Sequence, residues 1–368
     1  MLIFFLVIIG LSFLIFAHEA AHFLLAKFFK LKVHEFGFGF PPRITAKKIG
    51  ETEYSLNWLP FGGFVRIAGE RGEFEMVNAE EDLAKSEKQG VRSEDGNSVA
   101  PSSLPLAPSR LFYAQPAWKK SLILLAGVMM NFVLGWFLIS GALMIGTPKA
   151  IVVTDVEANS PAAAIGIQPG DALQGYATSQ AFIDFVNAHR GQPVQLNLLR
   201  NAKEVTITVT PRVTTAANEG AIGIGLADAG SPSEAPLAAL RDGFLASINM
   251  FSAILVAFGN LAKQIFVHAS LPQGVVGPVG IFGVAQETGK IGLIYLLQFI
   301  GIISINLAVV NLIPFPALDG GRFLMVVIEK IKGSPVPKKL EMWVNGLGFA
   351  FLLSLMALLT VRDVWNLW

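Results

Sequence analysis

Residues 2–26 read LIFFLVIIGLSFLIFAHEAAHFLLA, and this stretch decides the class of the fold. A helix needs roughly 20 mainly apolar residues to cross the hydrocarbon core of a bilayer, so the stretch predicts a transmembrane helix. It begins without basic residues and carries His18 and Glu19 inside its apolar run, which argues against a removable signal peptide. Three further stretches meet the same length criterion: Ser121–Ile145, Ile291–Ile313 and Asn345–Val361.

The composition excludes an ordinary soluble protein. Of the 368 residues, 53% are hydrophobic and only 15% are charged, whereas charged residues make up about a quarter of a typical soluble chain. The net charge of +1 and the lack of basic clusters interleaved with aromatic residues argue against a nucleic-acid partner. Because cysteine is absent, disulfides and thiolate ligands are excluded, and a transition-metal site must use His, Asp or Glu.

Basic residues predict how the chain is oriented in the membrane. The positive-inside rule assigns the flanks that carry them to the cytoplasm, so residues 147–242 are expected on the extracytoplasmic side. These charges agree with one another only if Phe244–Phe266 does not cross, and we expect a helix there that lies at the membrane surface. The expected fold is an α-helical polytopic membrane protein with four transmembrane helices. The basic residues are Lys27, Lys30, Lys32, Arg43, Lys47, Lys48, Lys119, Lys120, Lys330, Lys332, Lys338 and Lys339.

Segments between the apolar stretches differ in character. Glu53–Leu59 and Gly63–Ala68 resemble short strands joined by a turn at residues 60–63. Residues 70–110 are acidic and then rich in Ser and Pro, which predicts a mobile cytoplasmic insertion. Residues 151–212 predict a small αβ domain. Its expected strands are Ile151–Val156, Val194–Leu199 and Glu204–Thr210, and its expected helices are Ser160–Ile165 and Gln180–His189.

These segments predict six consecutive regions. They are the first transmembrane helix with the hairpin at 1–69, the insertion at 70–115, the second transmembrane helix at 116–147, the soluble domain at 148–228, an amphipathic surface helix and linker at 229–290, and the third and fourth transmembrane helices at 291–368.

The sharpest chemical signal is His18-Glu19-Ala20-Ala21-His22. Residues four apart on a helix share a face, so both imidazoles can reach one zinc ion. Glu19 lies beside them and can take a proton from the attacking water. On a soluble helix the same pattern is often a chance occurrence or a solvated face. Inside an apolar span that alternative is weak, because ionisable groups there are costly and usually serve function.

A catalytic zinc needs a third protein ligand and an open position for water. Asp319 is a better candidate than His34, because it follows a span that runs inward and so ends at the membrane depth of His22. Pro314 and Pro316 break the helix before it, and the two glycines that follow it permit a tight turn. Unwound backbone at this depth is tolerated only where it is buried or lines a watery cavity. The alternative is a loop that ends the span, with Asp319 as a helix cap.

Together these motifs resemble the site-2 proteases, and specifically the bacterial RseP-type regulated intramembrane metalloproteases of peptidase family M50. The resemblance covers nearly the whole chain. It is carried by His18–His22, Pro60–Gly63, Gly127–Asn131, Gly277–Ile281 and Asn311–Gly320.

The resemblance implies a set of site residues. One zinc per chain is expected, held by His18, His22 and Asp319, with Glu19 as the general base. Asn311 is expected to contact the substrate backbone near the scissile bond. The region Glu53–Ala68 is similar to a membrane-associated β-hairpin that pairs with an extended substrate strand, as in β-augmentation. Its residues expected to bind substrate are Gly62, Gly63 and Phe64.

The soluble domain resembles a PDZ domain through Ser160–Ala163 and Gly166–Asp171, and Ala221–Leu226 is expected to supply its last strand. The resemblance implies an enzyme of the bacterial inner membrane, with the active site toward the cytoplasm and the PDZ domain outside. It implies single-span membrane proteins as substrates, such as anti-sigma factors or signal-peptide remnants. Peptide ends at the PDZ domain and membrane lipid are further expected partners, and nucleic acid is not.

Two functions of other classes compete with proteolysis. A non-catalytic membrane PDZ adaptor would be favoured by a degenerate His-Glu motif or a missing aspartate, and neither is seen. A metal transporter usually has inverted repeats and more spans, which four spans and a soluble domain fit poorly. Asn131, inside the second apolar stretch, is interpreted as a hydrogen bonder in helix packing rather than a catalytic group.

Overall fold

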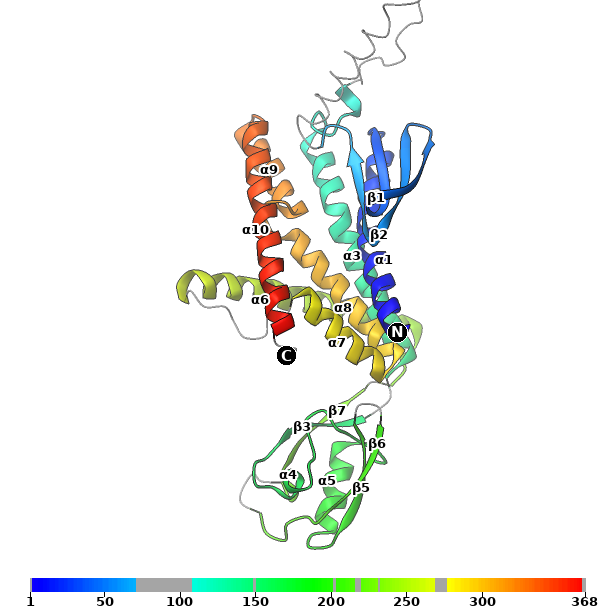
Figure 1. Ribbon diagram of the computed structural model, residues 1–368, viewed down its shortest axis with the longest axis vertical. Helices are drawn as coiled ribbons and strands as arrows, with labels where there is room; N and C mark the ends of the chain where they lie inside the picture. Colours follow the sequence, from blue (N-terminus) through cyan, green and yellow to red (C-terminus); the bar gives the residue numbers. More distant parts are fainter. Residues whose placement is uncertain are drawn as a thin grey trace, which may run out of the picture. The chain divides into compact units, whose positions relative to one another are not determined.

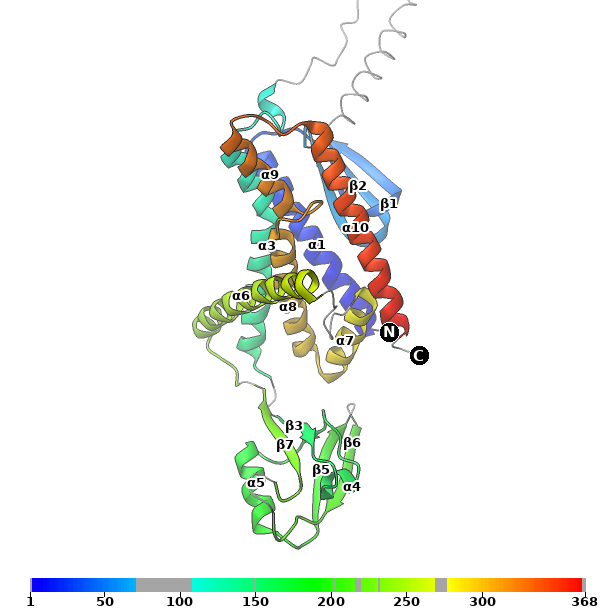
Figure 2. The ribbon, with the colours of Figure 1, turned by 90° about the vertical axis from the view of Figure 1, so that its left-hand side faces the viewer.

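The computed structural model describes residues 2–70, 108–147, 150–200, 203–215, 220–230, 232–268 and 277–365. Figures 1 and 2 show the elements from two directions. The chain forms two compact units, of which the first comprises Met1–Trp136, Ser247–Gly283 and Ile300–Trp368, and the second Phe137–Ala246 and Val284–Phe299. Most of the insertion expected at 70–115 lies outside the described residues.

Five helices in the described part of the chain are long and apolar enough to cross a membrane. Four of them match the predicted spans. The fifth, α6 (Pro236–His268), contains the segment expected at the membrane surface and is the least apolar of the five. The count of four spans and the surface position of α6 therefore stay predictions. The other four helices are α1 (Leu2–Phe28), α3 (Ala117–Ile145), α8 (Leu293–Leu312) and α10 (Lys338–Trp365).

Small residues bring α1, α3 and α8 close together in the first unit. A Cβ added at Gly10 of α1 would lie 2.7 Å from the Ile300 side chain of α8, and one at Gly135 of α3 would lie 2.5 Å from Ile305. Ser304 Oγ donates a hydrogen bond of 2.7 Å to the backbone carbonyl of Asn131. Small residues at helix interfaces let backbones approach, and hydroxyl groups then bond across the contact. These contacts fix which faces the helices turn toward one another.

Five further helical elements among the described residues are shorter than the five apolar helices. A 3-10 helix at Pro108–Arg110 precedes α3, and α7 (Pro278–Ile291) begins within the stretch Gly277–Ile281. Asp363, near the end of α10, accepts hydrogen bonds from the backbone N–H groups of Gly277 at 3.2 Å and Gly280 at 2.8 Å. Helix α9 (Asp319–Lys332) ends at Gly333 in the left-handed conformation. In the second unit, α4 spans Pro161–Ala164 and α5 spans Ser179–Ala188.

The sheet beside α1 differs from the predicted hairpin. It consists of two long strands, β1 (Val33–Ile49) and β2 (Thr52–Ile67). Residues 53–56 and 63–66 do not pair with each other, because both pair with residues 35–38 of β1, on opposite sides. Residues 43–49 of β1 then pair with 52–57 of β2. The expected turn at 60–63 is therefore a bend within β2, and the expected short hairpin is a wider sheet of four limbs.

Aromatic residues fasten this sheet to α1. Phe16 of α1 contacts Phe36 and Phe38 of β1 at ring-centroid distances of 5.3 and 5.5 Å, and Phe23 stacks on Phe36 at 4.7 Å. Alternate residues of a strand face opposite sides, so the phenylalanines cover α1 while Gly37 between them faces away. The sheet is thereby held along the helix that carries the His-Glu motif.

The second unit contains a five-stranded sheet with the order β6-β5-β4-β3-β7. Side chains of β3, β5 and α5 meet in its core, with Phe182, Leu196 and Leu198 almost fully buried. Ser160 and Thr178 cap α4 and α5 through their hydroxyl groups. The predicted strands and helices are present within one or two residues at either end, except that the last strand lies three residues later than expected. The strands are β3 (Ala150–Val156), β4 (Ala172–Leu173), β5 (Val194–Arg200), β6 (Lys203–Val209) and β7 (Ile224–Ala229).

Candidate metal centre

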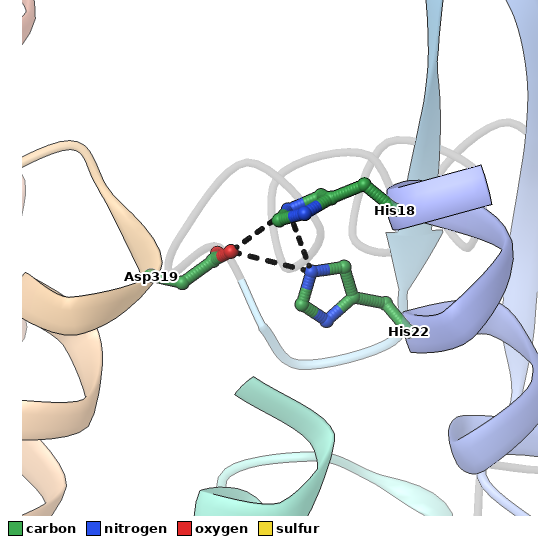
Figure 3. Close-up of side chains that lie close together, drawn as sticks. All are labelled: His18, His22 and Asp319. Carbon is green, nitrogen blue, oxygen red and sulfur yellow. Dashed lines mark hydrogen bonds and ion pairs between the residues drawn. The ribbon is translucent and has the colours of Figure 1, made fainter. Parts of the chain in front are cut away.

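Three residues predicted as metal ligands converge in the first unit (Figure 3). Their candidate ligand atoms, two imidazole nitrogens and one carboxylate oxygen, all lie within 4.8 Å of one another. His18 Nε2 is 3.0 Å from Asp319 Oδ2, His22 Nε2 is 3.3 Å from the same oxygen, and the two nitrogens are 3.2 Å apart. Both histidines are buried. Residues separated by 301 positions in the sequence thus share one site.

The break between α8 and α9 positions Asp319 beside the two histidines. Helix α8 ends at Leu312, and α9 begins at Asp319 itself, with Leu318 as an N-cap that makes no side-chain capping bond. A Cβ at Gly320 would lie 2.2 Å from the Leu312 carbonyl oxygen, and one at Gly321 would lie 2.1 Å from that of Phe315. Only glycine fits where the backbone approaches itself so closely. A loop does end the span, but Leu318 and not Asp319 is the N-cap residue, and the Asp319 carboxylate contacts the imidazoles.

Helix α3 supports both imidazoles from the other side. His22 Nδ1 donates a hydrogen bond of 2.7 Å to the backbone carbonyl of Ile123, and the Asn131 amide lies 3.2 Å from His18 Nδ1. Gly127 sits between these two positions, where a Cβ would lie 2.4–2.5 Å from His18 Cε1, His18 Nε2 and His22 Nε2. We call Ile123, Gly127 and Asn131 the α3 platform. It fixes one ring nitrogen of each histidine and leaves the other facing Asp319.

The arrangement fits a cation. A carbonyl oxygen can only accept a hydrogen bond, so His22 Nδ1 carries a proton. In a neutral ring His22 Nε2 then carries a free lone pair. That lone pair faces a carboxylate oxygen and the second imidazole nitrogen, His18 Nε2, so three atoms able to bind a metal converge. Ligand atoms bound at about 2.0–2.1 Å to a tetrahedral zinc are about 3.3–3.4 Å apart. The observed separations of 3.0, 3.2 and 3.3 Å are close to this value. The donor set of two imidazoles and a carboxylate is one that zinc accepts.

Glu19 lies in the electrostatic environment of the same residues. The charges of His22, His18, Asp319 and Glu70 all act on its carboxyl group. Among the described residues it has no hydrogen-bonding or ion-pairing partner, so its carboxylate is not committed to a structural contact. This is the state expected of a group that exchanges a proton.

The residues expected to contact substrate lie at different places. Asn311, half-buried in the last turn of α8, has no hydrogen-bond partner among the described residues. Gly62, with φ of 95°, and Gly63 lie against Ile15 and Phe16 of α1. Phe64 instead covers Gly37 on the face away from α1, so these three consecutive residues of β2 do not form one surface.

Comparison with known proteins identifies the family. The sequence matches the model of peptidase family M50 over residues 6–355. The chain belongs to peptidase family M50. Similar proteins include the zinc metalloprotease RasP of Geobacillus kaustophilus, 32% identical over 98% of this chain and 96% of that protein. A putative zinc metalloprotease of Clostridium perfringens is 32% identical over 97% of each chain. The regulator of sigma-W protease RasP of Bacillus subtilis is 30% identical over 99% of this chain and 98% of its own.

Membership of the M50 family, together with the apolar helices, makes this chain an intramembrane zinc metalloprotease. The contacts of the α3 platform in this M50 protein go beyond what its sequence predicts. The sequence predicts a packing role for Asn131, whereas its amide contacts His18. The spacing of Gly127 and Asn131, four apart on one helix face, is the signal that could have placed both residues at one site.

Proposed function

We propose that His18, His22 and Asp319 hold the catalytic zinc and that Glu19 is the general base of peptide-bond hydrolysis. The observation that carries the proposal is the convergence of the three ligand atoms within 4.8 Å. Bound zinc supplies a Lewis acid that activates water and polarises the scissile carbonyl. Three protein ligands leave a tetrahedral ion one open position.

Glu19 handles the proton in this proposal. Glu19 follows the proposed ligand His18 in sequence, and the charges of His18, His22 and Asp319 act on its carboxyl group. A carboxylate without a structural partner would accept a proton from the attacking water and return it to the leaving amine, which would complete hydrolysis.

Transmembrane segments of single-span membrane proteins are the proposed substrates. The name of the Bacillus subtilis relative describes a protease that regulates sigma-W, which favours anti-sigma factors, and signal-peptide remnants are the second class. Residues 63–66 of β2 pair with β1 on one side, and an extended substrate strand can add to the other. Gly62 contacts Ile15, one helical turn or about 6 Å before Glu19. Asn311 is proposed to contact the substrate backbone.

The five-stranded domain is proposed to be a PDZ domain that binds peptide ends. Its strand and helix order and the predicted Ser160–Ala163 and Gly166–Asp171 segments support this assignment. The lysines that flank the spans favour a position of the domain outside the cytoplasm and of the metal centre toward the cytoplasmic side of the bacterial inner membrane. The domain would then filter substrates rather than take part in hydrolysis.

Two substitutions test the assigned roles in the purified full-length protein. Glu19→Gln should keep zinc but lower the cleavage rate of a model transmembrane substrate by about 10²–10⁴-fold, because it removes only the proton acceptor. Asp319→Ala should lose both zinc affinity and cleavage, because two protein ligands remain. Glu204→Gln, on an exposed strand position of the second unit, is the control for loss of a carboxylate.

The outcomes separate the competing functions. Cleavage at the wild-type rate by zinc-loaded Glu19→Gln would refute the assignment of Glu19 as the base. If the protein were an adaptor, Glu19→Gln would leave its binding of partners unchanged. If Asp319→Ala binds stoichiometric zinc, another residue is the third ligand, and His34 is the next candidate. A transporter would exchange its zinc rapidly, whereas a protease retains one tightly held ion.

A further inference from the structure

Asn131 is a buried polar residue whose role helix packing does not explain. Its exposed fraction is 1%, and its helix is already tied to α8 through the bond from Ser304 to its backbone carbonyl. One end of its side-chain amide lies 3.2 Å from His18 Nδ1. The other end has no hydrogen-bond partner among the described residues. A buried amide that leaves one end unpaired is costly, and such groups persist where the paired end serves a function.

The chemistry of His18 decides which end of the amide faces it. His18 Nε2 is the nitrogen that faces Asp319 and His22, so it must be the lone pair if His18 binds zinc. The ring proton then resides on Nδ1 and needs an acceptor. The nitrogen and oxygen of an asparagine amide have almost the same shape, and their placement follows from the hydrogen-bond network. The Asn131 amide therefore turns its oxygen, not its NH₂ group, toward His18.

His22 provides an internal comparison. Its Nδ1 proton goes to the backbone carbonyl of Ile123, two helical turns before Asn131 on α3. The two rings are thus oriented by the same device, a carbonyl-type oxygen from α3. The difference is that the partner of His22 is backbone, which substitution cannot remove, and the partner of His18 is a side chain.

We infer that Asn131 is the positioning residue of His18, whose Nδ1 proton it accepts through its side-chain oxygen. This holds the imidazole in the tautomer that offers Nε2 beside Asp319. The inference rests on the proposed zinc ligation by His18. Loss of a partner of this kind typically lowers metal affinity by about 10–100-fold.

The test compares Asn131→Leu with Asn131→Asp in the purified full-length protein. Asn131→Leu keeps the size and removes the acceptor, so zinc affinity measured by chelator competition should fall by about 10–100-fold. Asn131→Asp keeps an acceptor oxygen and loses the NH₂ donor, so it should restore affinity to near the wild-type value. Ser140→Ala is the matched control, because Ser140 is also a buried, unpaired polar residue of α3. It should bind zinc like the wild type.

A second readout does not depend on activity. In the zinc-loaded protein, ¹⁵N NMR of labelled histidine should show His18 protonated at Nδ1 and hydrogen-bonded there, with the signal assigned by its loss in His18→Ala. In Asn131→Leu the Nδ1 signal of His18 should shift to that of an N–H group without an acceptor, while the signal of His22 stays unchanged. A purely structural Asn131 would leave the His18 signal unchanged.

The outcomes also separate this inference from the proposed function. If His18→Ala loses zinc but Asn131→Leu binds it with wild-type affinity, the positioning role is wrong and the ligand assignment stands. A wild-type His18 protonated at Nε2 likewise overturns the inference. If His18→Ala itself binds zinc like the wild type, the ligand assignment fails first.

Discussion

Replacing Gly127 by alanine should disable the metal centre through a single methyl group. The added Cβ would lie 2.4 Å from His18 Cε1 and 2.5 Å from His18 Nε2 and His22 Nε2. Non-bonded atoms normally approach to about 3.5 Å, so both rings would have to retreat by about 1 Å. They cannot do so and keep the bonds to Ile123 and Asn131. Metal ligands must lie within about 0.2 Å of their ideal distances, so the displacement is several times too large.

The expected loss of zinc affinity is about 100-fold, equivalent to about 2.7 kcal/mol, with a parallel loss of cleavage. Chelator competition on the purified protein measures the first and cleavage of a model transmembrane substrate the second. Gly141→Ala on the same helix is the matched control, because its Cβ would meet only Leu297 Cδ2 at 3.9 Å. Alanine favours a helix over glycine by about 0.8–1 kcal/mol, so helix propensity cannot explain a loss. Full zinc and normal cleavage in Gly127→Ala would refute the platform argument.

Two predictions concern the five-stranded domain. Removing residues 150–229 should relax substrate choice but keep zinc binding and cleavage of a short model substrate. The cut ends can be rejoined because Glu234 N donates a hydrogen bond to Leu143 O at 3.0 Å. A folded, zinc-loaded deletion variant that is inactive on every substrate would contradict this prediction. Asp171→Asn should destabilise the domain by about 3 kcal/mol at pH 7, because Arg200 binds both Asp171 oxygens at 2.6–2.7 Å. Burial raises the pKa of Asp171, but the bonds from Arg200 and Gln168 N–H outweigh it and lower the pKa. The stabilisation from the ionised Asp171 is therefore present above the unfolded-state pKa of about 3.9 and is lost as the pH falls below that value. The difference in unfolding temperature between the wild type and Asp171→Asn should therefore narrow in acid. An equal difference at pH 7 and pH 3 would contradict this origin.

Local patterns predicted the elements whose signals lie within a short stretch of sequence. The length of an apolar run sets a span, and the spacing of His18 and His22 sets a shared helix face, so both could be read directly. The strands β3, β5 and β6 show alternation or β-branched residues over a few positions. The sheet beside α1 was only partly predicted, because glycine and proline in β1 disfavour a strand, although Phe36, Phe38 and Phe40 alternate with other residues. Its four-limb pairing also depends on contacts between distant residues.

The sequence by itself determined the membrane class, the exclusion of cysteine chemistry, the His-Glu motif and Asp319 as the leading third ligand. Only the tertiary structure decided how these parts face one another. A helix that is apolar all round gives no periodicity that says which side packs against a neighbour, so the facing of α1, α3 and α8 follows from Gly10, Gly135 and Ser304. The acceptor for His22 is a backbone carbonyl, which residue 123 would supply whatever its side chain. Residue identity therefore could not reveal it, and Asn131 looked like a packing residue until α3 was placed against α1.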